Sequence, residues 1–146
     1  MTHWLAISNR SNSEIVIKKN IWGVSNKYLL KISQVKPGDS LLLYTGQQMV
    51  EKELIPPKIT AVFEITSNFY EDQSKIFTSP LKLGDEIFPY RIHLKLIKIF
   101  KPPVDFKSLI PKLNFITNKK MWTGHIRGKA MRSIPEDDYQ FIISYD

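Results

Sequence analysis

The sequence predicts one globular domain of the α+β class, and three observations lead to that prediction. A chain of 146 residues has the size of a single domain. Its hydrophobic fraction of 42% is enough to fill one core. Strand-like alternation and helix start and stop signals follow one another along the whole chain. The sequence contains no internal repeat, no low-complexity tract and no apolar run of about 18 residues, so no membrane-spanning helix is expected.

The first third of the chain is expected to hold a strand, a helix and an aromatic loop. The mostly apolar run over residues 3–8 predicts a buried first strand. Ser11 begins a capping-box pattern, which predicts a helix that ends at Asn20. Gly23 disfavours a helix and suggests either a special backbone conformation or a close approach of another backbone. We therefore interpret residues 21–28 as a loop that presents an aromatic face.

The rest of the chain alternates turns with strand-like and helical segments. The Pro-Gly pair before Asp39 predicts a type II turn, and the Asp39 carboxylate is expected to bond to local backbone rather than to act as a catalytic acid. The acidic run after Pro135 predicts the positive end of a final helix, not an active site. In chain order, the other expected elements are a short helix over 27–35, a strand over 40–44, a surface loop over 46–57, a strand over 58–68, an irregular loop over 69–86, a strand over 89–100 that ends at Pro102-Pro103, a short helix over 106–110 and a short strand over 113–116.

The chain is basic, with 21 Lys and Arg against 14 Asp and Glu, a formal net charge of +7 and a pI near 9.5. This balance suits a polyanionic partner such as nucleic acid, although a lysine-rich surface also serves solubility alone. Residues 112–132 include several cations and no acidic residue, so the C-terminal third is the better candidate for a phosphate-facing surface. The candidate phosphate-binding residues are Arg91, Lys119, Arg127 and Lys129.

Two roles fit Trp22, which precedes Gly23. Large aromatic side chains most often fill cores, so Trp22 could close one end of the core. A Trp also offers a flat face to a nucleobase and a polar N–H group. Ser8 and Asn9 follow the first expected strand and are expected near Trp22, where they could read the edge of a base. Ser and Asn after a strand are also common turn and cap residues.

Several short motifs occur in an order that resembles the EVE domain family. They are Trp-Leu-Ala-Ile-Ser-Asn from Trp4, Ile-Trp-Gly-Val from Ile21, Lys-Pro-Gly-Asp and Leu-Leu-Leu-Tyr from Lys36, Tyr-Glu-Asp from Tyr70 and Phe-Pro-Tyr-Arg from Phe88. With the region 122–134 they cover nearly the whole chain. The resemblance implies a PUA-like mixed β-barrel with short peripheral helices. It also implies a relation to YTH domains, which read methylated adenine in RNA.

The resemblance further implies a pocket for a single base, with a modified base as the expected ligand and RNA or DNA as the partner. Ser8, Asn9 and Trp22 match the positions of the YTH base pocket, and Gly128-Lys129 matches the place of its phosphate-binding residue. Either Phe77 or Tyr70 could supply a second aromatic wall. The candidate base pocket consists of Ser8, Asn9, Trp22, Gly23, Val24, Tyr44, Tyr70 and Phe77.

An enzyme is the competing class, and the sequence gives it little support. His3, His93 and His125 lie far apart without metal-ligand spacing. No glycine-rich phosphate loop, nucleophile elbow or paired-carboxylate motif is present. Asp105-Phe106-Lys107 resembles half of a nuclease site, but Asp105 also fits a helix cap. We therefore expect no catalytic residue, no metal and no cofactor.

A protein-protein adaptor that uses the irregular segment 69–86 is the alternative within the binding class. Long loops are commonly binding loops, although their aromatic residues also pack onto their own domain. The chain has no Cys and no signal-peptide pattern at residues 1–7. A cytoplasmic protein without disulfides is therefore expected.

Overall fold

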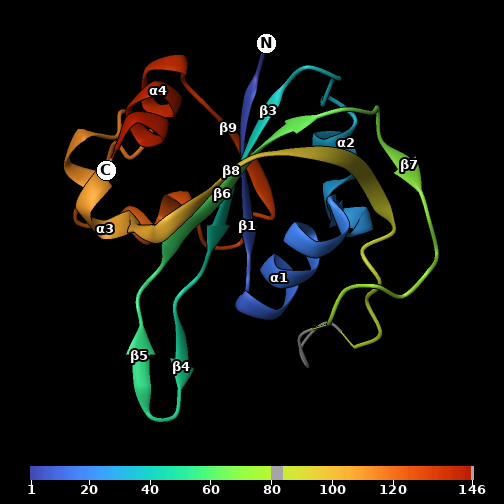
Figure 1. Cartoon of the computed structure of the whole chain (residues 1–146), viewed down its shortest axis with the longest axis horizontal. Coiled ribbons are helices and arrows are strands. Elements are labelled where there is room, and N and C mark those ends of the chain that lie inside the picture. The colour runs from blue at the N-terminus through green and yellow to red at the C-terminus, as the bar shows by residue number, and fades with distance from the viewer. Residues whose placement is uncertain (80–83, 146) are drawn as a thin grey trace.

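The fold is built from strands and short helices that follow one another along the whole chain (Figure 1). The computed structural model describes residues 1–79 and 84–145. The strands are β1 (His3–Ser8), β2 (Ile21–Val24), β3 (Ser40–Thr45), β4 (Gln48–Val50), β5 (Glu53–Ile55), β6 (Lys58–Ile65), β7 (Tyr70–Glu71), β8 (Tyr90–Asp105) and β9 (Met131–Ile134). The helices are α1 (Arg10–Lys19), α2 (Leu29–Ile32), α3 (Phe106–Leu109) and α4 (Glu136–Ser144), with 3-10 turns η1 (Asn26–Tyr28), η3 (Ile110–Lys112) and η4 (Trp122–His125).

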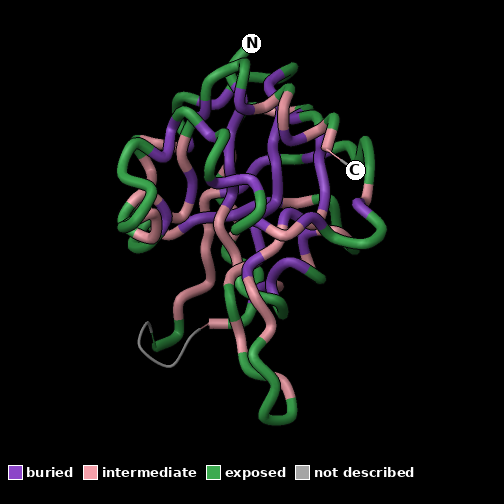
Figure 2. The backbone as a smooth tube through the Cα atoms, turned by 90° about the vertical axis from the view of Figure 1, so that its left-hand side faces the viewer, coloured by how far each residue is buried: buried purple, intermediate pink, exposed green. Residues whose placement is uncertain are grey.

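One curled, mixed sheet organises these elements. Its strands follow the order β2-β8-β6-β3-β1-β9, and β7 also pairs with β8. β1 and β3 are parallel, whereas the other paired strands of this sheet are antiparallel. β4 and β5 form a separate hairpin, which projects from the body of the molecule (Figures 1 and 2). The expected α+β class, with a mixed sheet and short peripheral helices, is confirmed.

The two faces of the sheet contribute to two separate hydrophobic clusters. Along β3, Leu41 and Leu43 belong to the first cluster, whereas Leu42 and Tyr44 belong to the second, as the period of two in a strand requires. The first cluster includes buried residues of α1, β2 and α2, and the second includes buried residues of α3 and α4. Figure 1 shows these two groups of helices on opposite sides of the sheet. Each face therefore has its own cover and its own core.

β8 bends around the domain because its pairing with β6 is irregular. The register of the β6–β8 ladder shifts twice, and bulges of this kind bend a strand. The shift between Ile59 and Ala61 of β6 accommodates Pro102 and Pro103, which have no N–H to donate to the ladder. Pairing resumes beyond them, where Asp105 lies opposite Lys58. The expected end of this strand at the two prolines is therefore wrong.

The beginning of the chain differs from expectation in two places. The loop expected over residues 21–28 is the strand β2 followed by η1, because β2 pairs with β8 and places Gly23 opposite Arg91. The cap of α1 is Asn9, not Ser11, since Asn9 Oδ1 accepts a hydrogen bond from the backbone N–H of Asn12 at 2.8 Å. The predicted strand over 3–8 and the helix end at Asn20 are confirmed.

Two other segments also differ from expectation. Residues 46–57, expected as a surface loop, contain the β4–β5 hairpin. Its turn has positive φ at Glu51 (49°) and Lys52 (68°), the backbone of a type I′ turn without the usual Asn-Gly signature. Residues 113–116 do not form a strand. Backbone N–H groups of Asn114 and Phe115 instead donate to the buried Asp138 carboxylate, each at 2.8 Å.

The turn before β3 contains a buried carboxylate that joins it to β1. Asp39 accepts hydrogen bonds from Thr2 N at 2.9 Å, from Trp4 Nε1 at 3.0 Å and from Lys36 N at 3.0 Å. Burial alone would raise the pKa of Asp39, but these hydrogen bonds outweigh it, and the pKa lies below its ordinary value of 3.8. The expected local role of Asp39 is confirmed, and it extends to the first strand.

Asp39→Asn is expected to lower the free energy of unfolding by about 1 to 3 kcal/mol near pH 7, because a neutral amide accepts these hydrogen bonds less strongly. Since folding lowers the pKa of Asp39, the carboxylate contributes fully above its ordinary value of 3.8, and this contribution is lost as the pH falls through the folded-state pKa. Urea unfolding of both proteins, near pH 7 and near pH 3, measures the difference.

Asp137→Asn is the matched control, because Asp137 lies exposed in the first turn of α4. It should change stability by less than about 1 kcal/mol. Equal losses in the two variants, or a loss in Asp39→Asn that does not shrink in acid, would contradict the role assigned to Asp39.

Candidate functional site

A pocket of about 300 Å³ opens beside the end of β1 and along β2. Its aromatic walls are Trp22, Tyr28, Phe77 and Phe88. The lining residues are Ile7, Ser8, Asn9, Asn12, Trp22, Gly23, Ser25, Lys27, Tyr28, Phe77, Phe88, Gly128, Lys129 and Ala130. Concave sites with apolar walls and a few polar groups are typical ligand sites, and this volume is at the small end of their range.

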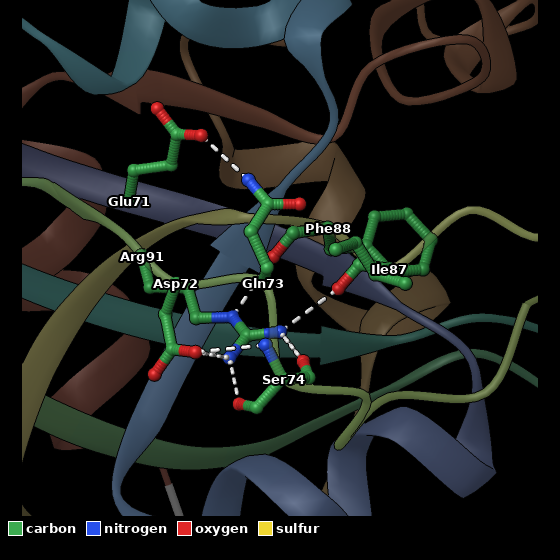
Figure 3. A network of polar contacts seen from close by, with 7 residues as sticks. All are labelled: Glu71, Asp72, Gln73, Ser74, Ile87, Phe88 and Arg91. Carbon is green, nitrogen blue, oxygen red and sulfur yellow. Dashed lines mark hydrogen bonds and ion pairs between the residues drawn. The ribbon is translucent and has the colours of Figure 1, made fainter.

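The segment that precedes β8 is held against the sheet by the buried side chain of Arg91 (Figure 3). Its Nε donates to Phe88 O at 3.0 Å, and its Nη2 donates to Ile87 O at 3.0 Å and to Ser74 O. Its Nη1 donates to Ser74 Oγ at 2.9 Å and lies 3.5 Å from Asp72 Oδ1. Every guanidinium nitrogen therefore has a partner, which offsets the cost of burying this charge.

Gly23 allows the same segment to lie directly on β2. A Cβ at this position would lie 2.8 Å from Phe77 Cε2, 2.8 Å from Phe88 O and 3.2 Å from Arg91 Cγ. The centroid of the Phe77 ring is 5.5 Å from the Arg91 guanidinium carbon and 6.0 Å from the Phe88 ring, which it meets edge to face. The close approach expected at Gly23 is confirmed, and it allows both Phe rings to line the pocket.

Asn12 joins this segment to α1. Its Nδ2 donates to Thr78 O at 2.9 Å, and its Oδ1 accepts from Thr78 N at 2.7 Å and from Thr78 Oγ1 at 3.1 Å. These bonds fix the residue that follows Phe77. Asn9 is exposed and uses its Oδ1 to cap α1, and its Nδ2 has no hydrogen-bond partner among residues 1–79 and 84–145.

Trp22 belongs to both the core and the pocket. Its side chain is 4% exposed and packs within the first hydrophobic cluster. Its Nε1 is buried and makes no hydrogen bond to any residue that the structure describes. A buried donor without a partner costs about 1 to 3 kcal/mol. Trp22 therefore fills the core, as one of its two expected roles requires, and also lines the pocket.

Tyr28 connects η1 to the loop that leads into β9. Its Oη donates to Gly128 O at 2.5 Å, and Gly128 has a φ of 76°, which favours glycine. Lys27 and Lys129 are exposed and line the pocket, and Lys27 Nζ lies 5.5 Å from the centre of the Tyr28 ring. No lining residue is acidic. The mouth of the pocket is therefore positively charged.

The pocket contains some of the residues expected from the sequence and not others. It includes Ser8, Asn9, Trp22, Gly23 and Phe77 of the expected base pocket, and Lys129 of the expected phosphate site. It also includes Asn12, Lys27, Tyr28 and Phe88, which were not among the residues expected from the sequence. Tyr28 lies in the expected aromatic segment and Phe88 in the Phe-Pro-Tyr-Arg motif, so both carried a signal. We find no such signal for Asn12.

Three candidates for the base pocket lie outside it. Val24 is fully buried in the first cluster and does not line the pocket. Tyr44 lies in the second cluster, edge to face with Phe106 at 4.9 Å, and burial raises its pKa to about 12. Tyr70 stacks on His93 at 4.8 Å. Of the two expected second aromatic residues, the pocket therefore contains Phe77.

Three candidate phosphate-binding residues also lie outside the pocket lining. Arg91 is fully buried and bonded to the preceding segment, so its charge does not reach the surface. Lys119 is exposed, and its Nζ donates to Leu113 O. Arg127 is exposed and follows η4, close in sequence to Lys129.

Comparison with known proteins decides the family. The family model of the EVE domain matches residues 2–145. The chain belongs to the EVE domain family. The chain is also similar to the UPF0310 protein PYRAB08750 of Pyrococcus abyssi, with 46% identity over 144 residues, which cover 99% of each chain.

Solved structures share the fold of this EVE domain. Human THYN1, solved in complex with DNA containing 5-methylcytosine, has a TM-score of 0.64 and 14% identity, and the match covers 99% of this chain and 96% of THYN1. The YTH domain of Zygosaccharomyces rouxii MRB1, solved in complex with N6-methyladenosine RNA, has a TM-score of 0.60 and 16% identity over 98% of this chain and 84% of that domain. The expected PUA-like fold is confirmed.

Residues 1–79 and 84–145 contain no group of three or more His, Cys, Asp or Glu that could hold a metal ion. In the same ranges no helix is long and apolar enough to cross a membrane. Asp105, considered above as half of a nuclease site, accepts a hydrogen bond from Ser108 Oγ at 2.8 Å at the start of α3.

Gly23→Ala is expected to destabilise the protein by about 1 to 3 kcal/mol, because its Cβ would overlap the Phe77 ring and the Phe88 carbonyl. The segment around Phe77 should then move away from β2 and become sensitive to protease. Gly124→Ala is the matched control, since a Cβ there would meet nothing within 4 Å. Urea unfolding and limited proteolysis measure both effects. If Gly23→Ala matched Gly124→Ala in both measurements, the close approach would not matter.

Arg91→Lys is expected to cost about 3 to 5 kcal/mol of stability, because an ammonium group cannot replace the planar fork of buried hydrogen bonds. Asp72→Asn should cost much less than Arg91→Lys, since the Asp72 side chain is 45% exposed and its contact with Arg91 is 3.5 Å long. Thermal and urea unfolding compare the two variants. An effect of Asp72→Asn as large as that of Arg91→Lys would show that the ion pair, and not the carbonyl contacts, holds the segment.

Proposed function

We propose that this EVE domain binds RNA or DNA and holds one modified base in the pocket between Trp22 and Phe77. The proposal requires a strand whose base is unstacked or turned out, because the pocket has room for little more than one planar ring system. The base would lie against aromatic side chains, and the strand would run past the positive mouth formed by Lys27 and Lys129.

The observation that carries the proposal is the aromatic pocket whose wall includes Trp22, together with the buried indole N–H of this residue, which has no partner among the described residues. The surrounding rings offer stacking, which is worth about 1 to 3 kcal/mol per base. Trp22 Nε1 needs an acceptor, and a ring nitrogen or a carbonyl oxygen of a base is of the right kind. The free Nδ2 of Asn9 is a second donor at the rim. An apolar ligand without an acceptor would leave the buried indole N–H unsatisfied.

The comparisons support the class of ligand. Human THYN1 was solved with DNA containing 5-methylcytosine, and the MRB1 YTH domain was solved with N6-methyladenosine RNA. Two proteins of this fold therefore bind methylated nucleic acid, one as DNA and the other as RNA. A buried methyl group adds on the order of 0.8 kcal/mol, so a preference for a methylated base through burial alone should be only a few-fold.

Trp22→Phe is expected to weaken binding of a strand that contains one modified base by about tenfold, because Phe keeps a ring but lacks the indole donor and part of the stacking surface. Fluorescence anisotropy of labelled single strands of about ten nucleotides measures this. The strands contain 5-methylcytosine, N6-methyladenine or only plain bases, as DNA and as RNA. Anisotropy is preferable to protein fluorescence, since the substitution removes a fluorophore.

Trp122→Phe is the matched control, because Trp122 contacts Phe106 in the second hydrophobic cluster and lines no part of the pocket. Melting temperatures of both variants separate loss of binding from loss of fold. Binding without preference for any base, equal in Trp22→Phe and Trp122→Phe, would contradict base capture. Binding of none of the strands by the wild type would contradict nucleic-acid binding itself.

We further propose that the protein binds its strand without cleaving it. Asp105 is engaged by Ser108 at the start of α3, on the side of the sheet opposite the pocket cluster. Incubation of the labelled strands with the wild type and Mg²⁺, followed by gel electrophoresis, should leave them intact. Cleavage that disappears in Asp105→Ala would overturn this part of the proposal.

A further inference from the structure

The β4–β5 hairpin projects from the body of the molecule into solvent (Figure 2). We call residues 47–56, which contain this hairpin, the arm. None of its residues is buried, and no hydrogen bond or ion pair joins it to the rest of the described chain. A two-stranded hairpin by itself is only marginally stable in water. A contact with another molecule would therefore stabilise the arm.

The middle of the arm is apolar. Met49 lies opposite Leu54 in the ladder, and their side chains are 63% and 52% exposed. Directly opposite residues share one face of a hairpin, so these two side chains form one apolar surface. Val50 and Ile55 point to the other face and are half-buried. Apolar side chains on both faces of a projecting hairpin are typical of a contact surface.

The tip of the arm is acidic, although the chain is basic. Glu51, Lys52 and Glu53 are all exposed, so two carboxylates face one ammonium group, whereas the whole chain has a net charge of +7. The two carboxylates would repel the phosphates of a nucleic acid and would be costly to bury in lipid. A protein surface that is apolar and basic is the complementary partner.

A surface of this kind lies at the base of the arm. A cavity of about 370 Å³, which we call the proline groove, has a lining that includes Lys98, Phe100, Lys101, Pro102, Pro103 and Asp105. Asp105 lies opposite Lys58 in the ladder, and the N–H of Phe106 donates to Pro57 O at 3.0 Å. Since Pro57 and Lys58 follow the arm directly, the proline groove adjoins its base.

The proline groove combines apolar walls with an excess of positive charge. Phe100 is buried in the second hydrophobic cluster, and Lys98 Nζ lies 5.1 Å from the centre of its ring. Lys98 and Lys101 are exposed, and neither forms an ion pair within the described chain. Asp105 is the one acidic residue of the lining and accepts a hydrogen bond from Ser108 Oγ at 2.8 Å. The groove therefore matches the tip of the arm in charge.

The arm points away from the groove at its own base (Figure 1). A strand rises about 3.3 Å per residue, so the tip lies roughly 15 Å from the base. Two arms that lie side by side in opposite directions would each bring their tip to the base of the other. A two-fold axis through the middle of the arms generates this arrangement and brings the two Met49–Leu54 surfaces together.

We propose that two copies of this EVE domain form a two-fold dimer through their arms, with the tip of each arm in the proline groove of the other copy. Glu53 pairs with Lys101 of the second copy, and Leu54 packs against the middle of the second arm. The groove belongs to the second hydrophobic cluster, whereas Trp22 of the pocket belongs to the first. The inference therefore goes beyond the proposed function and does not depend on it.

Leu54→Gln tests the apolar contact. Sedimentation equilibrium of nuclease-treated protein, from about 1 to 100 μM, measures the dissociation constant of the dimer. The mass of the wild type should approach twice the monomer value of 17.0 kDa as the concentration rises. Leu54→Gln should raise the dissociation constant by at least about tenfold, because both copies lose a buried Leu side chain.

Leu30→Gln is the matched control, since Leu30 is 81% exposed on α2 and belongs neither to the arm nor to the proline groove. It should leave the dissociation constant unchanged. Melting temperatures at a concentration where all the proteins are monomers should agree, so that weaker association does not come from a damaged fold.

Charge reversal tests the seat of the tip. Glu53→Lys and Lys101→Glu should each weaken the dimer by about two- to tenfold, because each dimer loses two exposed ion pairs. The double variant Glu53→Lys/Lys101→Glu restores both pairs with opposite sign, and its association should return to within about twofold of the wild type. Glu53→Lys/Lys107→Glu has the same net charge, but Lys107 does not line the groove, so no recovery is expected.

Three results would overturn the dimer. The first is a wild type that stays monomeric at every concentration, or that doubles in mass only when a strand is added. The second is an equal dissociation constant for Leu54→Gln and Leu30→Gln. The third is equal association of the two double variants, which would exclude the groove as the seat of the tip. A monomer that still binds strands with a base preference would leave the proposed function intact.

Discussion

The buried guanidinium of Arg91 is the interaction on which the pocket depends. A charge of this kind is costly to bury unless each of its donors is satisfied. Here the partners are carbonyl and hydroxyl groups of Ser74, Ile87 and Phe88, with Asp72 at the outer side. These partners come from both ends of the segment between β7 and β8. One side chain of the sheet therefore fixes a long connection at two points and presents Phe77 and Phe88 towards β2.

The close approach of this connection also explains why β2 contains a glycine. Gly is unfavourable within a strand because it adds no packing of its own and loses more backbone entropy on folding. At position 23 this loss is offset by the contact of the strand with Phe77 and with the Phe88 carbonyl, which no larger residue would permit. Arg91 lies opposite Gly23 in the ladder, so the residue that holds the connection and the residue that makes room for it are paired across two strands.

The sequence was sufficient to predict the fold class and part of the site. The elements that were predicted follow from local patterns, whereas those that were missed depend on distant parts of the chain. β1, the turn at Asp39 and the end of α1 at Asn20 follow from local patterns that the structure confirms. The strand character of residues 21–24 could not be read locally, because it depends on pairing with β8 some seventy residues later along the chain. The same is true of Arg91, whose charge suggested a phosphate contact until its partners were known.

Tyr44 and Tyr70 show a different limit of sequence reasoning. Both occur in motifs of the EVE domain family, but a motif does not specify which face of a sheet a side chain occupies. Tyr44 differs from Leu43 by one position along β3, and that single step places it in the opposite cluster. Only long-range contacts distinguish Phe77 from Tyr70. Thr78, which follows Phe77, is hydrogen-bonded to Asn12, and the Phe77 ring and Arg91 both lie against Gly23.

The structure separates the groups that could recognise a base from those that could hold a strand. Trp22, Phe77 and Phe88 are positioned by the core and by buried hydrogen bonds, so the pocket walls are held in place before a ligand enters. Lys27 and Lys129 lie at the surface, where salt screens them. Stacking and one buried methyl provide only a few kcal/mol between them. Selectivity for a modified base would therefore come from the pocket, and most of the affinity for a strand from cations that do not distinguish one base from another.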